Sequence, residues 1–265
     1  MKYYVVADVH GFCSILKDAL NEKGFFNDEE PHKLIICGDL FDRGGEAVEL
    51  QNFILELLEK DEVILIKGNH EELLVDMLNS WHRASYLESH HNSNGTVDTV
   101  LQLTGTRLAD LYDNPSDVYY KVKETPFMQK ILPAMVDYFE TEYHIFVHGR
   151  IPCESIRQNP YAVTYFAIDD WRNASAKQWS SARWINGMDA AHDGVMEENK
   201  TIVCGHWHSS YGHSRYERKC SEFGDDADFS PYYGKGIVAI DACTVRSKQI
   251  NCIVIEEQER TKNVC

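Results

Sequence analysis

The stretch LIICGDLFDRG, residues 34–44, joins a short apolar run to a polar loop that carries two aspartates and an arginine. The run Leu34–Cys37 is continuously apolar, which is typical of a strand that is covered on both faces. The polar residues Asp39, Asp42 and Arg43 begin where this run ends. Because ligands bind at the carboxyl ends of strands in α/β sheets, the stretch predicts a functional loop that follows a buried strand.

Four more strand-length apolar runs are followed by residue types that bind metals. The runs are Tyr3–Ala7, Val63–Ile66, His144–Val147 and Thr201–Cys204, and the residues that follow them are Asp8 and His10, Asn69 and His70, His148, and His206 and His208. A lone Asp-x-His or Asn-His after a strand is more often structural than a ligand, for example as a helix cap. Five such segments in order make coincidence improbable, so we expect the five strand ends to converge on one site.

Helix-length segments separate the first three strands. Ser14–Lys23 and Glu46–Glu59 each place apolar side chains on one face, so the chain opens β-α-β-α-β, which indicates the α/β class. The stretch from about 71 to 142 has a mostly helical pattern and is interpreted as an insertion or cap, whereas 152–200 and 209–236 have no regular pattern. The residues Trp81, Trp171, Trp179 and Trp184 are expected to pack a helical cap rather than line a substrate groove.

The composition is that of a soluble globular protein. Of the 265 residues, 43% are apolar, and no apolar stretch approaches the roughly 20 residues that a membrane helix needs, so we expect a cytoplasmic protein without a membrane partner. Residues 1–265 are expected to form a single domain. The net charge of −16 disfavours a nucleic-acid partner. The eight cysteines include no CxxC pair and are interpreted as reduced thiols, with a thiolate metal site as the minor alternative.

The residue types indicate which metals the site would take. Carboxylate, imidazole and one amide, without a thiolate, suit Mn²⁺, Fe or Zn²⁺ rather than a structural thiolate zinc site. One aspartate can bridge two cations with its two oxygens. Two cations about 3.5–4 Å apart can clamp a phosphate and generate a hydroxide between them. The pattern therefore favours the hydrolysis of phosphate esters.

Together these segments resemble the calcineurin-like metallophosphoesterase family, and within it the bacterial type of the phosphoprotein (serine/threonine) phosphatase branch. The branch motifs GDxHG, GDxxDRG, GNHE and HGG correspond to residues 7–11, 38–44, 68–71 and 148–150. The resemblance spans Asp8 to His208 but is carried by these motifs. It implies an α/β fold, a layered sandwich of two mixed β-sheets flanked by helices, with a helical insertion.

The resemblance also implies a ligand set for two divalent metal ions, with Mn²⁺ foremost and Fe or Zn²⁺ as alternatives. Asp39 would bridge the two ions. The first ion would also be bound by Asp8 and His10, and the second by Asn69, His148 and His206. His208 resembles the second His of a GHxH motif that ligates the first metal in the wider superfamily, although the protein phosphatases usually lack this residue.

Three residues acquire catalytic roles from the same resemblance. His70 would be the general acid that protonates the leaving alcohol, with Asp42 orienting it, because an imidazolium held by a carboxylate keeps its proton near neutral pH. Arg43 would grip the phosphate oxygens with its planar guanidinium. The milder alternatives are a local ion pair between Asp42 and Arg43 and a His70 that caps the following helix.

Three positions depart from the family pattern. Arg150 replaces the second Gly of HGG and either binds phosphate or points away. Arg183 resembles a phosphate-binding Arg of bacterial members, so Arg150 and Arg183 join Arg43 as candidate substrate-binding residues. Asp241 either supports a ligand histidine or faces solvent.

These observations lead us to expect a metal-dependent phosphatase that hydrolyses phosphomonoesters through a hydroxide bound to two metals. The substrate would be a phosphoprotein or a small phosphorylated molecule. The pair Asp42 and Arg43 favours this activity over a phosphodiesterase or nuclease, and a dinucleoside polyphosphate hydrolase is a further alternative. A non-catalytic scaffold is the remote alternative, because every expected ligand position is occupied. The natural substrate and the oligomeric state stay open.

Overall fold

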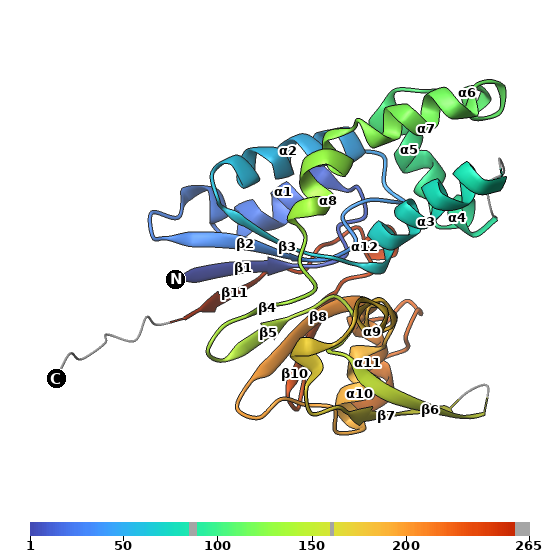
Figure 1. Cartoon of the computed structure of the whole chain (residues 1–265). Helices are drawn as coiled ribbons and strands as arrows, with labels where there is room; N and C mark the ends of the chain where they lie inside the picture. Colours follow the sequence, from blue (N-terminus) through green and yellow to red (C-terminus); the bar gives the residue numbers. More distant parts are fainter. Residues whose placement is uncertain (85–88, 160–161, 258–265) are drawn as a thin grey trace.

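The computed structural model describes residues 1–84, 89–159 and 162–257 (Figure 1). The first three strands of the chain belong to one sheet. The first sheet has the strand order β11-β1-β2-β3. The strands β1 (Lys2–Val6), β2 (His32–Cys37) and β3 (Val63–Ile66) run parallel, and β11 (Ile253–Glu256) is antiparallel to β1. The helices α1 (Cys13–Glu22) and α2 (Ala47–Glu59) connect the parallel strands.

The second sheet is also mixed. Its strand order is β4-β5-β8-β10-β9. The central strands β5 (His144–Phe146), β8 (Thr201–His208) and β10 (Ile237–Asp241) run parallel, and the edge strands β4 (Phe139–Glu140) and β9 (Tyr232–Gly234) are antiparallel to their neighbours. Two mixed sheets flanked by helices confirm the predicted α/β class and layered architecture.

Strand β1 shows why these strands are continuously apolar. Val5 faces a core between the two sheets that it shares with Ile35 and Val203, whereas Tyr4 and Val6 face the core beneath the helices. Each strand of the parallel set is therefore buried on both faces, and its sequence shows no polar alternation. The packing of the two sheets fixes their relative position at the edge where the functional loops emerge.

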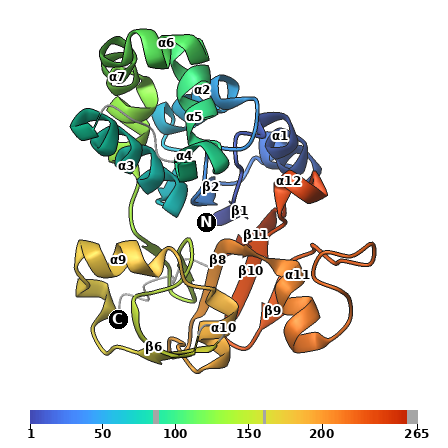
Figure 2. The same ribbon diagram turned by 90° about the vertical axis from the view of Figure 1, so that its right-hand side faces the viewer.

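The helices that follow β3 pack on the outer side of the first sheet. They are α3 (Asn69–Ala84), α4 (Ser89–Ser93), α5 (Thr96–Thr104), α6 (Leu108–Asp113), α7 (Pro115–Lys123), η2 (Phe127–Ile131) and α8 (Leu132–Ala134). Figure 2 shows α5 next to α2, with α6 and α7 above them, and Val97, Val100 and Phe127 share one core with Leu50 of α2. The helical pattern was expected over about 71–142, and its status as an insertion in a single domain stays a prediction. None of the helices in the described ranges combines the length and apolar character needed to cross a bilayer.

The two regions without a regular sequence pattern contain short elements instead. They are β6 (Cys153–Asn159), β7 (Ala162–Ala167), η3 (Trp171–Asn173), α9 (Ala176–Ala182) and α10 (Gly187–His192) in the first, and α11 (Ser209–Gly212), η4 (His213–Glu217) and β9 in the second. The hairpin β6–β7 was missed because nearly all of β6 is exposed, so no burial imposes an alternating pattern on it. A last short helix, α12 (Thr244–Ser247), precedes β11.

The tryptophans do not all pack as expected. Trp81 is buried in the core beneath the helices, but Trp171 and Trp179 are buried in the core behind the second sheet. Trp179 stacks there on Tyr138, with the ring centroids 5.3 Å apart. Trp184 is 51% exposed, so the expectation that it packs inside the protein is wrong.

Candidate active site

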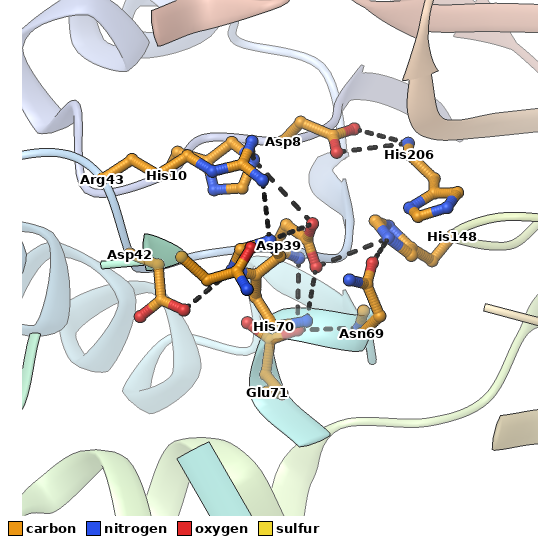
Figure 3. A network of polar contacts seen from close by, with 12 residues as sticks. Asp8, His10, Asp39, Asp42, Arg43, Asn69, His70, Glu71, His148 and His206 are labelled. Carbon is orange, nitrogen blue, oxygen red and sulfur yellow. Dashed lines mark hydrogen bonds and ion pairs between the residues drawn. The ribbon is translucent and has the colours of Figure 1, made fainter. Parts of the chain in front are cut away.

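The loops at the carboxyl ends of five strands meet at one edge of the two sheets (Figure 3). His10, Asp39 and His70 offer ligand atoms within 4.8 Å of one another, and so do Asp39, His148 and His206. Asp39 belongs to both groups, and Figure 3 shows it between them. This is the geometry of two adjoining cation sites that share one carboxylate.

The two carboxylate oxygens of Asp39 face different histidines. Its Oδ2 lies 3.8 Å from Nε2 of His10 and 3.8 Å from Nε2 of His70. Its Oδ1 lies 3.4 Å from Nε2 of His148, and that nitrogen lies 2.7 Å from Oδ1 of Asn69. One oxygen is therefore directed to each group, as a bridging carboxylate requires.

Hydrogen bonds on the far side of two rings fix how the histidines face the cluster. Nδ1 of His10 lies 3.0 Å from the carbonyl oxygen of Phe41, and Nδ1 of His148 lies 2.8 Å from that of Cys37. Because a carbonyl oxygen can only accept, each Nδ1 carries the proton. Nε2 of His10 keeps its lone pair and accepts a hydrogen bond from Nη1 of Arg43. This tautomer can bind a cation through Nε2.

The backbone of these loops adopts a conformation that side chains seldom allow. Asp8, His10, Asp39 and His206 have φ values of 52°, 50°, 55° and 67°, in a region that few non-glycine residues occupy. Such positions cluster at functional sites, where surrounding contacts outweigh the strain. Here the amide of His10 donates to the carbonyl of Asp39 at 2.9 Å, and the amide of His206 donates to the carboxylate of Asp8 at 2.9 Å. The second contact joins the two sheets.

Two glycines allow the loops to approach so closely. At Gly38, where φ is 83°, an added Cβ would lie 2.5 Å from Nδ1 of His148. At Gly68, an added Cβ would lie 2.1 Å from Oδ1 of Asp39. Any side chain at either position would displace one of the candidate ligands, so the glycines of these motifs are required by space.

Burial determines the charge state of the histidines in the cluster. It lowers the pKa of His10 to about 3 and that of His206 to about 3, and it also lowers the pKa of His148. These three imidazoles are therefore neutral near pH 7. Neutral imidazole is the form that binds a metal ion.

Three buried carboxylates lie beside these neutral rings. Burial, and then the charges of Asp241 and Asp39, raise the pKa of Asp8 well above its usual value. Burial also raises the pKa of Asp241 to about 6. Burial acts in the same direction on Asp39, but the nearby histidines outweigh it and lower the pKa of that carboxyl. A divalent cation would relieve this concentration of negative charge, and the nitrogen and oxygen donors present fit a dinuclear divalent site.

His70 lies at the edge of the cluster and is paired with a carboxylate. Its Nδ1 lies 2.7 Å from Oδ2 of Asp42, and its Nε2 faces Asp39. Burial alone would lower the pKa of His70, but the charge of Asp39 and the hydrogen bond with Asp42 outweigh it and raise the pKa. The exposed Arg43 places Nη1 3.1 Å from Nε2 of His10 and Nη2 3.1 Å from Nε2 of His70. Because a guanidinium can only donate, Nε2 of each ring accepts from Arg43 in this arrangement. A titratable imidazole and a cationic fork thus adjoin the shared carboxylate.

His208 lies at the rim of the cluster. Its Nε2 lies 2.8 Å from Oε1 of Glu222, and its ring packs against Phe223 with the centroids 4.5 Å apart. Among the described residues it belongs to neither ligand group, although it lines the same cavity as His10 and Asp241. The ligand role of His208 stays a prediction, and Glu222 is the partner that it would exchange for a metal.

The two other arginines that were predicted to bind substrate are engaged elsewhere. Arg183 is 5% exposed and donates to the carboxylates of Glu72 and Asp137. Arg150 is 1% exposed and donates to the carbonyl of Val195 in the core behind the second sheet. Arg150 therefore points away from the cluster, which was one of its two expected outcomes. In the described part of the chain, neither arginine lines the cavity at the cluster, so we propose no phosphate contact for them.

Glu71, for which the sequence predicted no role, joins the loops that follow β2 and β3. The carboxylate of Glu71 accepts the amides of Gly68 at 2.7 Å, Leu40 at 2.9 Å and Asp39 at 3.1 Å. Burial, and then the charge of Asp39, raise the pKa of Glu71 to about 7. Its place in the GNHE motif was the available signal, but its partners are amides, which have no signature in the sequence.

Two threonines of α5 were missed as well. The hydroxyls of Thr96 and Thr99 donate to the carboxylate of Asp42 at 2.8 and 2.7 Å. The signal in the sequence is a pair of threonines three residues apart at the start of a helix, which places both hydroxyls on one face. Such pairs are too common to be singled out without knowing what they face.

The cluster opens into a cavity of about 420 Å³ that is lined by His10, Arg43, His206 and Trp184, among others. The half-exposed ring of Trp184 stands edge-on to His206, with the ring centroids 5.9 Å apart and the planes at 85°. Trp184 and Trp207 also line a larger hollow of about 1270 Å³. The two cavities therefore share an aromatic wall formed by Trp184 and Trp207.

Comparisons with known proteins give a family match over most of the chain and partial relatives. The family model for calcineurin-like phosphoesterase matches residues 1–229. The symmetrical bis(5'-nucleosyl)-tetraphosphatase of Buchnera aphidicola is 37% identical over 75 residues, which are 28% of this chain and 26% of that protein. Serine/threonine-protein phosphatase 1 of Salmonella typhimurium is 36% identical over 73 residues, which are 28% of this chain and 31% of that protein. The chain thus spans between a quarter and a third of the length of these two relatives.

A solved structure shares the fold over nearly the whole chain. The cold-active protein-tyrosine phosphatase of a psychrophilic Shewanella species superimposes with a TM-score of 0.54, covering 97% of this chain and 75% of that one. The two sequences are 15% identical, so the likeness concerns the fold alone. It extends the sandwich of two sheets beyond the segments that the curated relatives match.

Proposed function

The chain belongs to the calcineurin-like phosphoesterase family, and from this premise we propose that it is a metal-dependent phosphatase that hydrolyses phosphomonoesters. The observation that carries the proposal is Asp39, whose two oxygens face two separate groups of histidines. Burial lowers the pKa values of His10, His148 and His206, so each ring can offer a lone pair to a cation. A pair of divalent cations would balance the charge of the buried carboxylates around them.

The residues present divide between two cations. Asp8, His10 and Asp39 would hold one, and Asp39, Asn69, His148 and His206 would hold the other. We propose Mn²⁺, with Fe or Zn²⁺ as alternatives, because the donors are nitrogen and oxygen without a thiolate. When bound, the two cations would supply Lewis acidity toward the phosphate oxygens and activate the attacking water.

The side chains around the cations bind the substrate and move the proton. Arg43 lies on the solvent side of the cluster and binds phosphate oxygens with its guanidinium. His70 donates the proton on Nε2 to the leaving oxygen as the phosphorus–oxygen bond breaks. Asp42 holds Nδ1 of His70, so that Nε2 points into the site. The proposed substrate is a phosphoprotein or a small phosphorylated molecule.

A dinucleoside polyphosphate hydrolase is the second candidate function. The wall formed by Trp184 and Trp207 favours it, because stacking a base on an aromatic ring contributes about 1–3 kcal/mol. One relative is itself named as a bis(5'-nucleosyl)-tetraphosphatase. A nuclease or other phosphodiesterase would use the same cation sites, and a scaffold that has lost the chemistry would have no reason to keep all the ligand types in one cluster.

An assay with four substrates separates these functions. The protein is loaded with Mn²⁺ and given p-nitrophenyl phosphate, bis(p-nitrophenyl) phosphate, diadenosine tetraphosphate and a phosphoserine peptide. We expect the monoester to be hydrolysed faster than the bis ester, and Asp39→Asn to abolish both activities. Faster hydrolysis of the bis ester would contradict the proposal, and a higher kcat/KM for diadenosine tetraphosphate would select the second candidate. Normal metal uptake without any hydrolysis would indicate a scaffold.

A further inference from the structure

Helix α5 contacts the carboxylate that holds the proposed acid. Oγ1 of Thr96 donates to Oδ2 of Asp42 at 2.8 Å, and Oγ1 of Thr99 donates to Oδ1 of Asp42 at 2.7 Å. Oδ2 is also the atom that binds Nδ1 of His70, at 2.7 Å. In addition, the amide of Asp42 donates to Oγ1 of Thr99 at 2.9 Å. Both carboxylate oxygens and the amide of Asp42 are therefore held by α5.

The contact continues along the same face of the helix. Gln102 donates from Nε2 to the carbonyl of Gly44 at 3.0 Å, and its Oε1 accepts the amide of Ala47 at 3.0 Å. Thr96, Thr99 and Gln102 follow one another at intervals of three, which places them on one side of the helix. One face of α5 thus makes polar contacts with the loop that carries the proposed catalytic residues and with the start of α2.

The junction is closely packed and excludes solvent. Thr96 and Thr99 are 0% and 1% exposed, and Asp42 is 2% exposed. Gly95, which precedes the helix with φ at 88°, lies so near that an added Cβ would be 2.4 Å from the amide nitrogen of Arg43. At such a dry contact, a lost hydroxyl leaves a carboxylate oxygen short of a hydrogen-bond partner that water does not readily replace.

We propose that Thr96 and Thr99 are positioning residues for proton transfer. They hold the carboxylate of Asp42 in the place from which it binds Nδ1 of His70 and aims Nε2 at the leaving oxygen. The proposal rests on the proposed function, in which His70 is the general acid. The proposal assigns a role in proton transfer to α5, a helix that lies outside the motifs of the family.

The test uses the leaving group, because a general acid matters most when the leaving oxygen is strongly basic. Phenyl phosphate has such a leaving group, and p-nitrophenyl phosphate does not. In the full chain loaded with Mn²⁺, we expect Thr96→Val and Thr99→Val to lower kcat on phenyl phosphate about tenfold or more, but on p-nitrophenyl phosphate less than about threefold, with KM unchanged. Thr99→Ser keeps a hydroxyl and should restore kcat to within about twofold of the parent.

A threonine on the same helix provides the matched control. Oγ1 of Thr104 donates to the carbonyl of Val100 at 2.6 Å and contacts the hydroxyl of Thr106. We expect Thr104→Val to leave kcat on both substrates within about twofold of the parent. A selective loss on phenyl phosphate in Thr104→Val would overturn the proposal, because any disturbance of α5 would then have the same effect.

Equal losses on the two substrates in Thr96→Val and Thr99→Val, or no loss at all, would also overturn the proposal. If Thr99→Val fails to fold, as judged by thermal unfolding and Mn²⁺ content, Thr96→Val removes a single hydrogen bond and decides by the same criterion. His70→Asn distinguishes a failure of the positioning role from a failure of the proposed function. If His70→Asn shows no selective loss of kcat on phenyl phosphate, the assignment of His70 as the general acid fails. If His70→Asn shows that selective loss and the threonine variants do not, only the positioning role of Thr96 and Thr99 fails.

Discussion

Histidines of the same cluster have pKa values that are shifted in opposite directions. Burial keeps His10 and His148 neutral, with lowered pKa values. His70 is also buried, but the charge of Asp39 and the hydrogen bond with Asp42 raise its pKa. Groups of one type whose pKa values are pushed apart in this way are suited to different tasks. Rings with lowered pKa values can give a lone pair to a cation, and the ring with the raised pKa is the one that we propose gives up a proton.

The variant His70→Asn tests the second task. We expect it to lower kcat on phenyl phosphate by about 10²–10⁴-fold, the usual contribution of a general acid. The Mn²⁺ content should stay at two per chain, because the proposed ligand in this loop is the neighbouring Asn69. Steady-state kinetics and elemental analysis measure both. Near-parental turnover of this poor leaving group would contradict the assignment of His70.

The variant Arg43→Ala tests phosphate binding. A guanidinium that donates charge-assisted hydrogen bonds to phosphate contributes about 1.5–3 kcal/mol, so we expect KM to rise about tenfold or more with a smaller change in kcat. Arg43→Lys keeps the charge but not the planar fork and should lie between the parent and Arg43→Ala. A fall in kcat at constant KM would show that Arg43 acts only in the transition state.

Among the elements, the sequence predicts those strands whose burial requires a recognisable pattern of apolar residues. The run Leu34–Cys37 predicts β2, which the structure extends to His32–Cys37, because both faces of this strand are buried. The hairpin of β6 and β7 has no such pattern, because β6 is almost wholly exposed. For elements of this kind, the sequence carries turn and composition signals that do not distinguish a hairpin from an irregular loop.

The same distinction applies to the candidate site. Its metal-ligand residue types directly follow predicted strands, so their convergence could be expected from the order of elements. Thr99, by contrast, meets Asp42 across 57 positions of sequence, through the packing of a helix whose location no motif indicates. Arg150 has a positively charged side chain two residues after the proposed ligand His148. The turn after His148 directs this side chain into the core behind the second sheet. Only tertiary packing decides such cases.

A network of ion pairs fastens the edge of the second sheet and gives a pH-dependent prediction. Glu140 of β4 accepts a hydrogen bond from Nε of Arg172 at 2.9 Å and lies 2.8 Å from Nζ of Lys200. The hydrogen bond from Arg172 is the main cause that lowers the pKa of Glu140 to about 2, from its usual 4.5. Because the folded-state pKa is depressed, the stabilisation is present above about pH 4.5 and is lost as the pH falls toward 2.

Glu140→Gln should therefore lower the free energy of unfolding by about 1 kcal/mol at pH 7, after allowance for the partly exposed partners. The difference from the parent should shrink as the pH falls and vanish near pH 2. Urea unfolding at pH 7, 4 and 3 measures this trend. A difference that stays constant with pH would show that Glu140 contributes through packing rather than through its charge.

At the scale of the whole molecule, the candidate ligands come from both sheets. Asp8, His10, Asp39 and Asn69 follow strands of the first sheet, whereas His148 follows β5 and His206 lies in β8 of the second. Cations at this edge would tie the two halves of the sandwich together. Mn²⁺ should therefore stabilise the folded protein, by about 2.7 kcal/mol for each site at a concentration one hundred times the Kd of that site.

Thermal unfolding with and without Mn²⁺ measures this stabilisation. We expect Tm to rise with the metal and to fall back when a chelator is added. Asp39→Asn should lose the shift, whereas Glu140→Gln, which lies outside the cluster, should keep the whole of it. If Asp39→Asn keeps the shift, Mn²⁺ binds elsewhere on the protein.

The most direct test is anomalous diffraction from a crystal of the protein soaked in Mn²⁺. We expect two anomalous peaks per chain, about 3.5–4 Å apart, with the carboxylate of Asp39 between them. Asp8 and His10 should contact one peak, and Asn69, His148 and His206 the other. A single peak, or peaks that leave Asp39 without a metal contact, would contradict the dinuclear site.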